Sequence, residues 1–127
     1  MAGQTSKPLP LSPHISIYRW RLTMLASIMH RASGVLLILG VPLALWLLLT
    51  MAHGHIGYFY GLTWMRSTYG MMILWLVSTA LCYHTCNGIR FLLLDIGYTD
   101  SREMMKLSAK IVLAITVVFA VLLAVWL

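Results

Sequence analysis

Hydrophobic and polar positions divide this chain into an N-terminal polar segment and three long apolar runs. Residues 1–22 are polar and contain three prolines too closely spaced for a helix. Residues 32–51 are almost wholly apolar, residues 67–89 contain no Lys, Arg, Asp or Glu, and residues 111–127 have Thr116 as their one polar side chain. Such runs can cross a bilayer as helices. We therefore expect an interfacial segment at 1–22 and a transmembrane domain at 23–127, with helices at about 23–50, 67–94 and 102–127.

The segments between these runs carry turn and cap residues. Residues 51–66 are rich in glycine and interfacial aromatics, which predicts a loop with a possible short helix lying in the membrane interface. Pro42 predicts a mild kink in the first helix, because a neighbouring helix can satisfy the freed carbonyl. Asp100 and Ser101 are both candidates to cap the third helix.

Composition supports an all-α integral membrane protein. Of the 127 residues, 61% are hydrophobic and 9% are charged, against about 25% charged in soluble proteins. Basic residues gather beside the first span and between the second and third spans, and Arg66 alone lies on the opposite side. This bias predicts a cytoplasmic N-terminus, or a matrix one in a mitochondrion. The chain has no dinucleotide fingerprint, so we do not expect it to carry a flavin.

His84 is the one imidazole inside the apolar runs. An ionisable side chain at that depth indicates a functional site. On a helix, Ala80 and Gly88 lie one turn to either side of it on the same face, which leaves a groove for a flat ligand such as a haem. The alternative is that His84 hydrogen-bonds a neighbouring helix and the small residues only permit close helix packing.

A second cluster lies at the start of the first helix. Ser27 and Arg31 are one turn apart, and His30 flanks them. These donors beside apolar walls suit a quinone carbonyl or the propionates of a haem, and they lie on the same side of the membrane as Arg90, with which they can converge. Alternatively, Arg31 extends to lipid phosphate and His30 lies among the headgroups.

Depth bears on whether His30 and His84 could share one iron. His84 precedes Arg90 by six residues, so it should lie about 9 Å inside the interface, whereas His30 adjoins Arg31 and should lie near the surface. The two axial nitrogens of one haem are about 4 Å apart. We therefore expect these two to be a poor axial pair, with any second imidazole coming from another chain.

Three motifs in order resemble the cytochrome b subunit of succinate dehydrogenase, the larger membrane anchor of complex II. They are Pro10-Leu11-Ser12-Pro13-His14-Ile15-Ser16-Ile17-Tyr18, then Ser27-Ile28-Met29-His30-Arg31-Ala32-Ser33-Gly34, then His84-x3-Gly88-Ile89-Arg90 followed by Asp95. The resemblance spans nearly the whole chain. Two positions depart from the family pattern: Phe91 stands where many members have His, and Leu9 where many have Arg.

The resemblance implies three transmembrane helices that form a bundle with a smaller sister anchor, with haem b between them. It makes His84 an axial ligand, His30 and Arg31 the holders of the propionates, and Ser27 and Arg31 part of the ubiquinone site. Iron–sulfur and flavoprotein subunits would dock on the cytoplasmic face and deliver electrons from succinate. The chain would then be a non-flavin subunit of an enzyme, inactive alone.

Two other functions remain open from the sequence. A quinol:fumarate reductase anchor has a similar architecture and passes electrons the other way. A non-redox scaffold or transporter subunit would use His84 and Arg31 only to hold helices together, although helices broken at mid-bilayer, which are typical of transporters, are not evident. The short N-terminal segment favours a bacterial inner membrane over a mitochondrial one.

Overall fold

The computed structural model describes residues 21–98 and 101–127. It contains four helices: α1 (Leu22–Ala52), α2 (Gly54–Met65), α3 (Thr68–Asp95) and α4 (Arg102–Trp126). By length and composition α1, α3 and α4 can each cross a membrane. The predicted all-helical fold with three membrane spans is thus confirmed. Apart from its last two residues, the predicted interfacial segment 1–22, with the first of the three motifs, lies outside the described residues.

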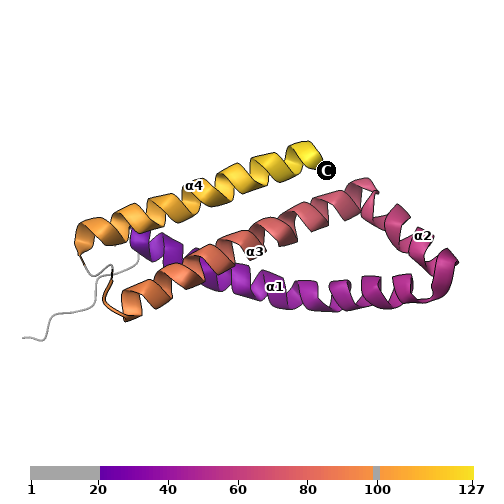
Figure 1. Ribbon diagram of the computed structural model, residues 1–127, viewed down its shortest axis with the longest axis horizontal. Coiled ribbons are helices and arrows are strands. Elements are labelled where there is room, and N and C mark those ends of the chain that lie inside the picture. Colours follow the sequence, from indigo (N-terminus) through magenta and orange to yellow (C-terminus); the bar gives the residue numbers. More distant parts are fainter. Residues whose placement is uncertain (1–20, 99–100) are drawn as a thin grey trace, which may run out of the picture.

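The three long helices run side by side in alternating directions. Figure 1 shows α3 returning antiparallel to α1, and α4 lying along α3 in the opposite direction to it. The short helix α2 joins α1 to α3 at one end of the bundle. The region predicted as a loop with a possible short helix is therefore mostly helical. Gly54 has a φ of 80°, which allows the chain to turn between α1 and α2.

Side-chain and backbone caps set the ends of α3 and α4. The Ser67 hydroxyl accepts a hydrogen bond from the amide of Gly70 at 3.1 Å, and Ser101 does the same for Met104 at 3.2 Å. Of the two predicted caps of the third helix, Ser101 is confirmed and Asp100 lies outside the described residues. Gly97, with a φ of 78°, reverses the chain after α3.

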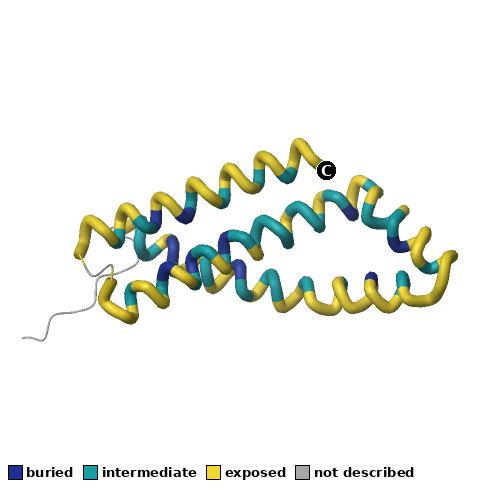
Figure 2. Tube along the Cα trace, in the orientation of Figure 1, coloured by how far each residue is buried: buried dark blue, intermediate teal, exposed yellow. Residues whose placement is uncertain are grey.

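The core is small and lies where the first half of α1 meets α3 and α4 (Figure 2). Ala109 and Val112 of α4 are buried there, and so are three polar residues: Ser33, Asn87 and Arg90. Elsewhere large apolar side chains face outward. Since lipid provides no hydrophobic force between helices, close packing and polar contacts must hold this bundle together.

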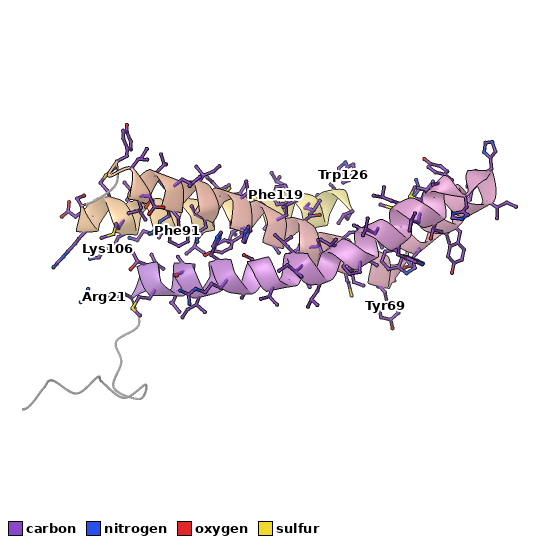
Figure 3. All side chains as sticks on the ribbon, turned by 90° about the horizontal axis from the view of Figure 1, so that it is seen from below. Arg21, Tyr69, Phe91, Lys106, Phe119 and Trp126 are labelled. Carbon is purple, nitrogen blue, oxygen red and sulfur yellow. The ribbon has the colours of Figure 1, made fainter. Side chains whose placement is uncertain are left out.

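Charge is distributed unevenly along the bundle. Arg21 and Lys106 lie at one end in Figure 3, with Tyr69 and Trp126 toward the other. At the basic end, a hollow of about 450 Å³ lies between the start of α1 and the start of α4. Its lining includes four cations: Arg21, Arg102, Lys106 and Lys110. The clustering of cations at one end agrees with the sequence pattern, and the cytoplasmic orientation drawn from it stays a prediction.

Candidate functional site

One side of α1 presents the residues of the second sequence cluster. Ser27, His30, Arg31 and Gly34 follow the spacing i, i+3, i+4 and i+7, so they lie along one strip of the helix. Arg31 is exposed, and Ser27 and His30 are half-buried. Within residues 21–98 and 101–127, neither the Ser27 hydroxyl nor the Arg31 guanidinium has a hydrogen-bond or ion-pair partner. Both donors are free to bind a ligand or another subunit.

The imidazoles of His30 and His84 are in direct contact. Their rings stack with centroids 4.0 Å apart and an angle of 11° between planes. The expected difference in depth between them is therefore wrong. Both histidines lie well inside their helices: α1 begins eight residues before His30, at Leu22, and α3 continues eleven residues past His84, to Asp95. Both rings thus lie more than two turns inside their helices.

The stacked arrangement bears on how iron could bind. Two axial imidazoles must point a nitrogen edge at the metal from opposite sides, with those nitrogens about 4 Å apart. Rings that stack face to face with centroids 4.0 Å apart leave no space for an iron atom between them. This geometry makes His30 and His84 unsuited to ligate one iron together.

Glycines create the space that the two rings occupy. A Cβ atom added to Gly34 would lie 3.1 Å from Cε1 of His84, and one added to Gly88 would lie 3.6 Å from Cε1 of His30. The sequence interpretation placed the small residues beside His84 on its own helix. In the structure, the glycine that faces His84 is Gly34 of α1, and Gly88 faces His30. The face of α3 expected to receive a flat ligand is here covered in part by an imidazole of α1.

Ser33 joins the two histidines and was missed by the sequence interpretation. Its hydroxyl donates to the backbone carbonyl of His30 at 2.8 Å, and its Oγ lies 3.1 Å from Nδ1 of His84. That Nδ1 atom is also 3.2 Å from the carbonyl oxygen of His30. The available signal was that Ser33 follows His30 by three residues and so shares its side of α1.

Three ring nitrogens in this cluster have no hydrogen-bond partner among the described residues: both nitrogens of His30 and Nε2 of His84. Nδ1 of His30 is buried and has no hydrogen bond in the part of the chain that the structure describes. Nε2 of His84 likewise has no partner among these residues, and it is absent from the buried unpaired atoms, so it keeps some exposure. Phe91 packs its ring edge-on against His30, with centroids 5.2 Å apart. An unpaired polar atom in an apolar region is costly, so such atoms indicate a site for a ligand.

These residues fit a haem. A metal-binding histidine commonly donates one ring N–H to a carbonyl or hydroxyl oxygen and presents the other nitrogen to the metal. His84 has two such oxygens beside Nδ1, and its Nε2 has no hydrogen-bond partner in the described part of the chain. His30 and Arg31, next to it on α1, are of the type that can pair with carboxylates.

Arg90, which from the sequence could converge with Ser27 and Arg31, instead turns toward α4. Its guanidinium donates to Ser108 Oγ at 3.0 Å, to the Met105 carbonyl at 3.2 Å, and to Asn87 Oδ1 at 3.4 Å. Arg90 follows His84 by six positions, which is one full turn of the helix plus a further rotation of about 240°. The two side chains therefore leave α3 on different sides, and Arg90 belongs to a helix-packing contact.

Comparison with known proteins now adds an independent line of evidence. The family described as the succinate dehydrogenase/fumarate reductase transmembrane subunit matches residues 5–123. The succinate dehydrogenase cytochrome b556 subunit of Paracoccus denitrificans is 39% identical over 114 residues, covering 89% of this chain and 87% of that protein. The corresponding protein of Rickettsia felis is 36% identical over 115 residues, covering 90% and 89%.

A mitochondrial relative extends the match. The succinate dehydrogenase cytochrome b560 subunit of Sus scrofa is 38% identical over 118 residues, covering 91% of this chain and 69% of that protein. Together with three apolar spans, the bacterial relatives support a location in a bacterial inner membrane. Relatives of this kind support the role of a membrane anchor. This chain belongs to the family of succinate dehydrogenase/fumarate reductase transmembrane subunits.

Proposed function

We propose that this chain is the cytochrome b anchor of a succinate:ubiquinone oxidoreductase, which binds haem b through His84 and contributes Ser27 and Arg31 to a ubiquinone site. One observation carries the proposal: His84 has Nδ1 held by α1 and Nε2 without a partner among the described residues, deep in a membrane helix. The relatives' names, which include cytochrome b, support the same reading.

His84 supplies one axial nitrogen in this proposal. Because the stacked His30 ring cannot reach the same iron, the second axial nitrogen comes from a sister anchor subunit. When bound, the haem supplies a one-electron redox centre inside the membrane. His30, whose buried Nδ1 lacks a partner among the described residues, and Arg31 hold its propionates.

Ser27 and Arg31 bind the quinone. The Arg31 guanidinium donates to a quinone carbonyl and stabilises the negative charge that develops there during reduction, while Ser27 donates a second hydrogen bond. Neither side chain forms a hydrogen bond or an ion pair within the described part of its own chain, so the donors of both are available to the quinone. Reduction of ubiquinone to ubiquinol takes two electrons, from succinate oxidation in partner subunits, and two protons from the adjacent aqueous side.

The basic end of the bundle is the proposed docking side. Four cations surround the hollow between α1 and α4, and Arg66 is the one cation near the opposite end among the described residues. Under the positive-inside rule this end faces the cytoplasm. The iron–sulfur and flavoprotein subunits bind there, which places incoming electrons beside Ser27 and Arg31.

Two alternatives fit less well. A quinol:fumarate reductase anchor needs the same side chains, and the family description covers both enzymes, but the relatives reported above are succinate dehydrogenase subunits. A non-redox scaffold gives no reason for three imidazole nitrogens without a partner among the described residues, since a packing histidine is stabilised by satisfying its polar atoms.

The test is a reduced-minus-oxidised visible spectrum of this chain purified with its sister anchor subunit. The wild-type pair should show the alpha band of a b-type haem, His84→Ala should lose it, and His55→Ala should retain it. His55 is a matched control because it is an exposed imidazole on α2, away from the cluster. A wild-type pair without haem would refute the cytochrome assignment.

The whole complex tests the quinone part. Arg31→Ala should lower succinate-dependent ubiquinone reduction about tenfold to a hundredfold, because a hydrogen bond from a charged donor is worth about 1.5–3 kcal/mol. Arg66→Ala, which removes a cation at the other end of the bundle, should leave the rate unchanged. Equal rates for the wild type and Arg31→Ala would exclude Arg31 from the site.

A further inference from the structure

We infer that Ser33 is the positioning residue for the haem ligand: it holds the Nδ1–H of His84, so that Nε2 presents its lone pair to iron. The inference rests on the proposed function, since it assigns a role toward the same haem. Ser33 lies on α1 and His84 on α3, so a residue 51 positions away in the chain sets the chemical state of the ligand.

The hydrogen-bond pattern determines which nitrogen carries the proton. Ser33 has one hydroxyl hydrogen, and it is directed at the His30 carbonyl oxygen 2.8 Å away. Its Oγ therefore offers only lone pairs to His84 Nδ1 at 3.1 Å. The second neighbour of Nδ1, the His30 carbonyl oxygen at 3.2 Å, is also an acceptor. With two acceptors beside it, Nδ1 must be the donor.

Alternative proton arrangements are disfavoured by their surroundings. The opposite tautomer would direct the Nδ1 lone pair at a carbonyl oxygen 3.2 Å away. A doubly protonated ring would be a cation inside the membrane, and no carboxylate forms an ion pair with His84 among the described residues. A neutral imidazole with its proton on Nδ1 has its lone pair on Nε2. That is the form of histidine that binds a metal.

Burial makes Ser33 hard to replace. Ser33 is 8% exposed, so water has little access to take over its contact with Nδ1. The hydroxyl and the carbonyl hold one edge of the ring, and Gly34 leaves space for the adjacent Cε1. Such contacts from the surroundings orient a ligand and raise its basicity. A more basic ligand favours ferric over ferrous iron, so Ser33 lowers the haem midpoint potential.

The experiment measures the haem midpoint potential in the purified anchor pair. Ser33→Ala should keep haem, since His84 and the His30 carbonyl remain, but its ferric form should lose stability relative to the ferrous form. Removing such a contact typically changes metal affinity about tenfold or more, and a tenfold change corresponds to about 59 mV for one electron. The potential should therefore rise. Ser33→Thr, which retains the hydroxyl, should return it toward the wild-type value.

Thr116→Ala is the matched control. The Thr116 hydroxyl also donates to a carbonyl of its own helix, that of Val112 at 2.9 Å, but contacts neither histidine. Thr116→Ala should therefore leave the haem midpoint potential unchanged. A wild-type potential in Ser33→Ala would overturn the inference, while the His84→Ala spectrum independently reports on the proposed haem site. If Ser33→Ala binds no haem, haem binding in Ser33→Thr would support the role of the hydroxyl. A Ser33→Thr pair that also binds no haem would refute that role.

Discussion

Two polar clusters lie on neighbouring faces of α3, and they differ in whether every polar side-chain atom has a hydrogen-bond partner among the described residues. The first contains Tyr83, Asn87 and Arg90, at i, i+4 and i+7. Tyr83 and Asn87 both donate to the Ala26 carbonyl, at 2.9 and 3.0 Å, and Arg90 binds α4. The second starts one residue later, with His84. It is turned about 100° around the helix, and it contains ring nitrogens that have no partner within residues 21–98 and 101–127.

Under the proposed function, this difference separates a structural role from a binding role. A polar group in a membrane helix stabilises the bundle only when its partners are present, because lipid offers none. The Tyr83–Asn87–Arg90 cluster finds its partners on α1 and α4 and so connects three helices. The histidine cluster satisfies His84 at Nδ1, whereas Nε2 of His84 and both ring nitrogens of His30 have no partner among the described residues. Adjacent positions on one helix thus serve different purposes.

Substitution of Asn87 should have the largest effect on stability. Asn87 is 0% exposed, and Asn87→Leu, of similar size, removes both its donor to Ala26 and its acceptor for Arg90. Leaving a buried donor unpaired costs about 1–3 kcal/mol. We expect the free energy of unfolding of the anchor pair to fall by that amount in a detergent unfolding titration.

The haem spectrum distinguishes the two clusters in the same variant. Since Asn87 forms no hydrogen bond with either histidine ring, folded Asn87→Leu should keep the wild-type alpha band and midpoint potential. Thr85→Leu is the control: Thr85 is an exposed polar residue of α3 without a side-chain hydrogen bond among the described residues. If Asn87→Leu has the same free energy of unfolding as this control, the Tyr83–Asn87–Arg90 cluster does not stabilise the bundle.

Sequence patterns were informative about the spans and less so about the contacts between them. Charge-free runs predicted the three long helices, and the two polar residues before the last helix, Asp100 and Ser101, were the predicted caps, of which Ser101 is confirmed. The relative rotation and sliding of the helices was not predictable, because α1 and α3 are apolar on most sides and no single face is marked for packing. The stacking of His30 on His84, and the roles of Ser33 and Gly34, depend on that rotation.

The first test of this close packing is Gly34→Ala, with an expected effect smaller than that of Asn87→Leu. The added Cβ would lie 3.1 Å from Cε1 of His84, so the ring must move by a few tenths of an ångström. Alanine suits a helix better than glycine does, so the helix itself should not be weakened. Disturbing the orientation of a metal ligand costs about tenfold in affinity. Haem titration of the purified pair should show this loss, and unchanged affinity would mean that the ring position is not constrained.

The smallest effect should come from Gly88→Ala, which places the same methyl group on the other ring. Its Cβ would lie 3.6 Å from Cε1 of His30, an ordinary van der Waals distance. Because His30 is not an axial ligand in this proposal, a slight change in its position leaves the iron site intact. We expect haem affinity and midpoint potential equal to wild type, with stability changed by less than about 1 kcal/mol. If haem affinity fell as far as in Gly34→Ala, haem binding would depend equally on the positions of both rings. The assignment of His84 as the ligand and His30 as its neighbour would then be wrong.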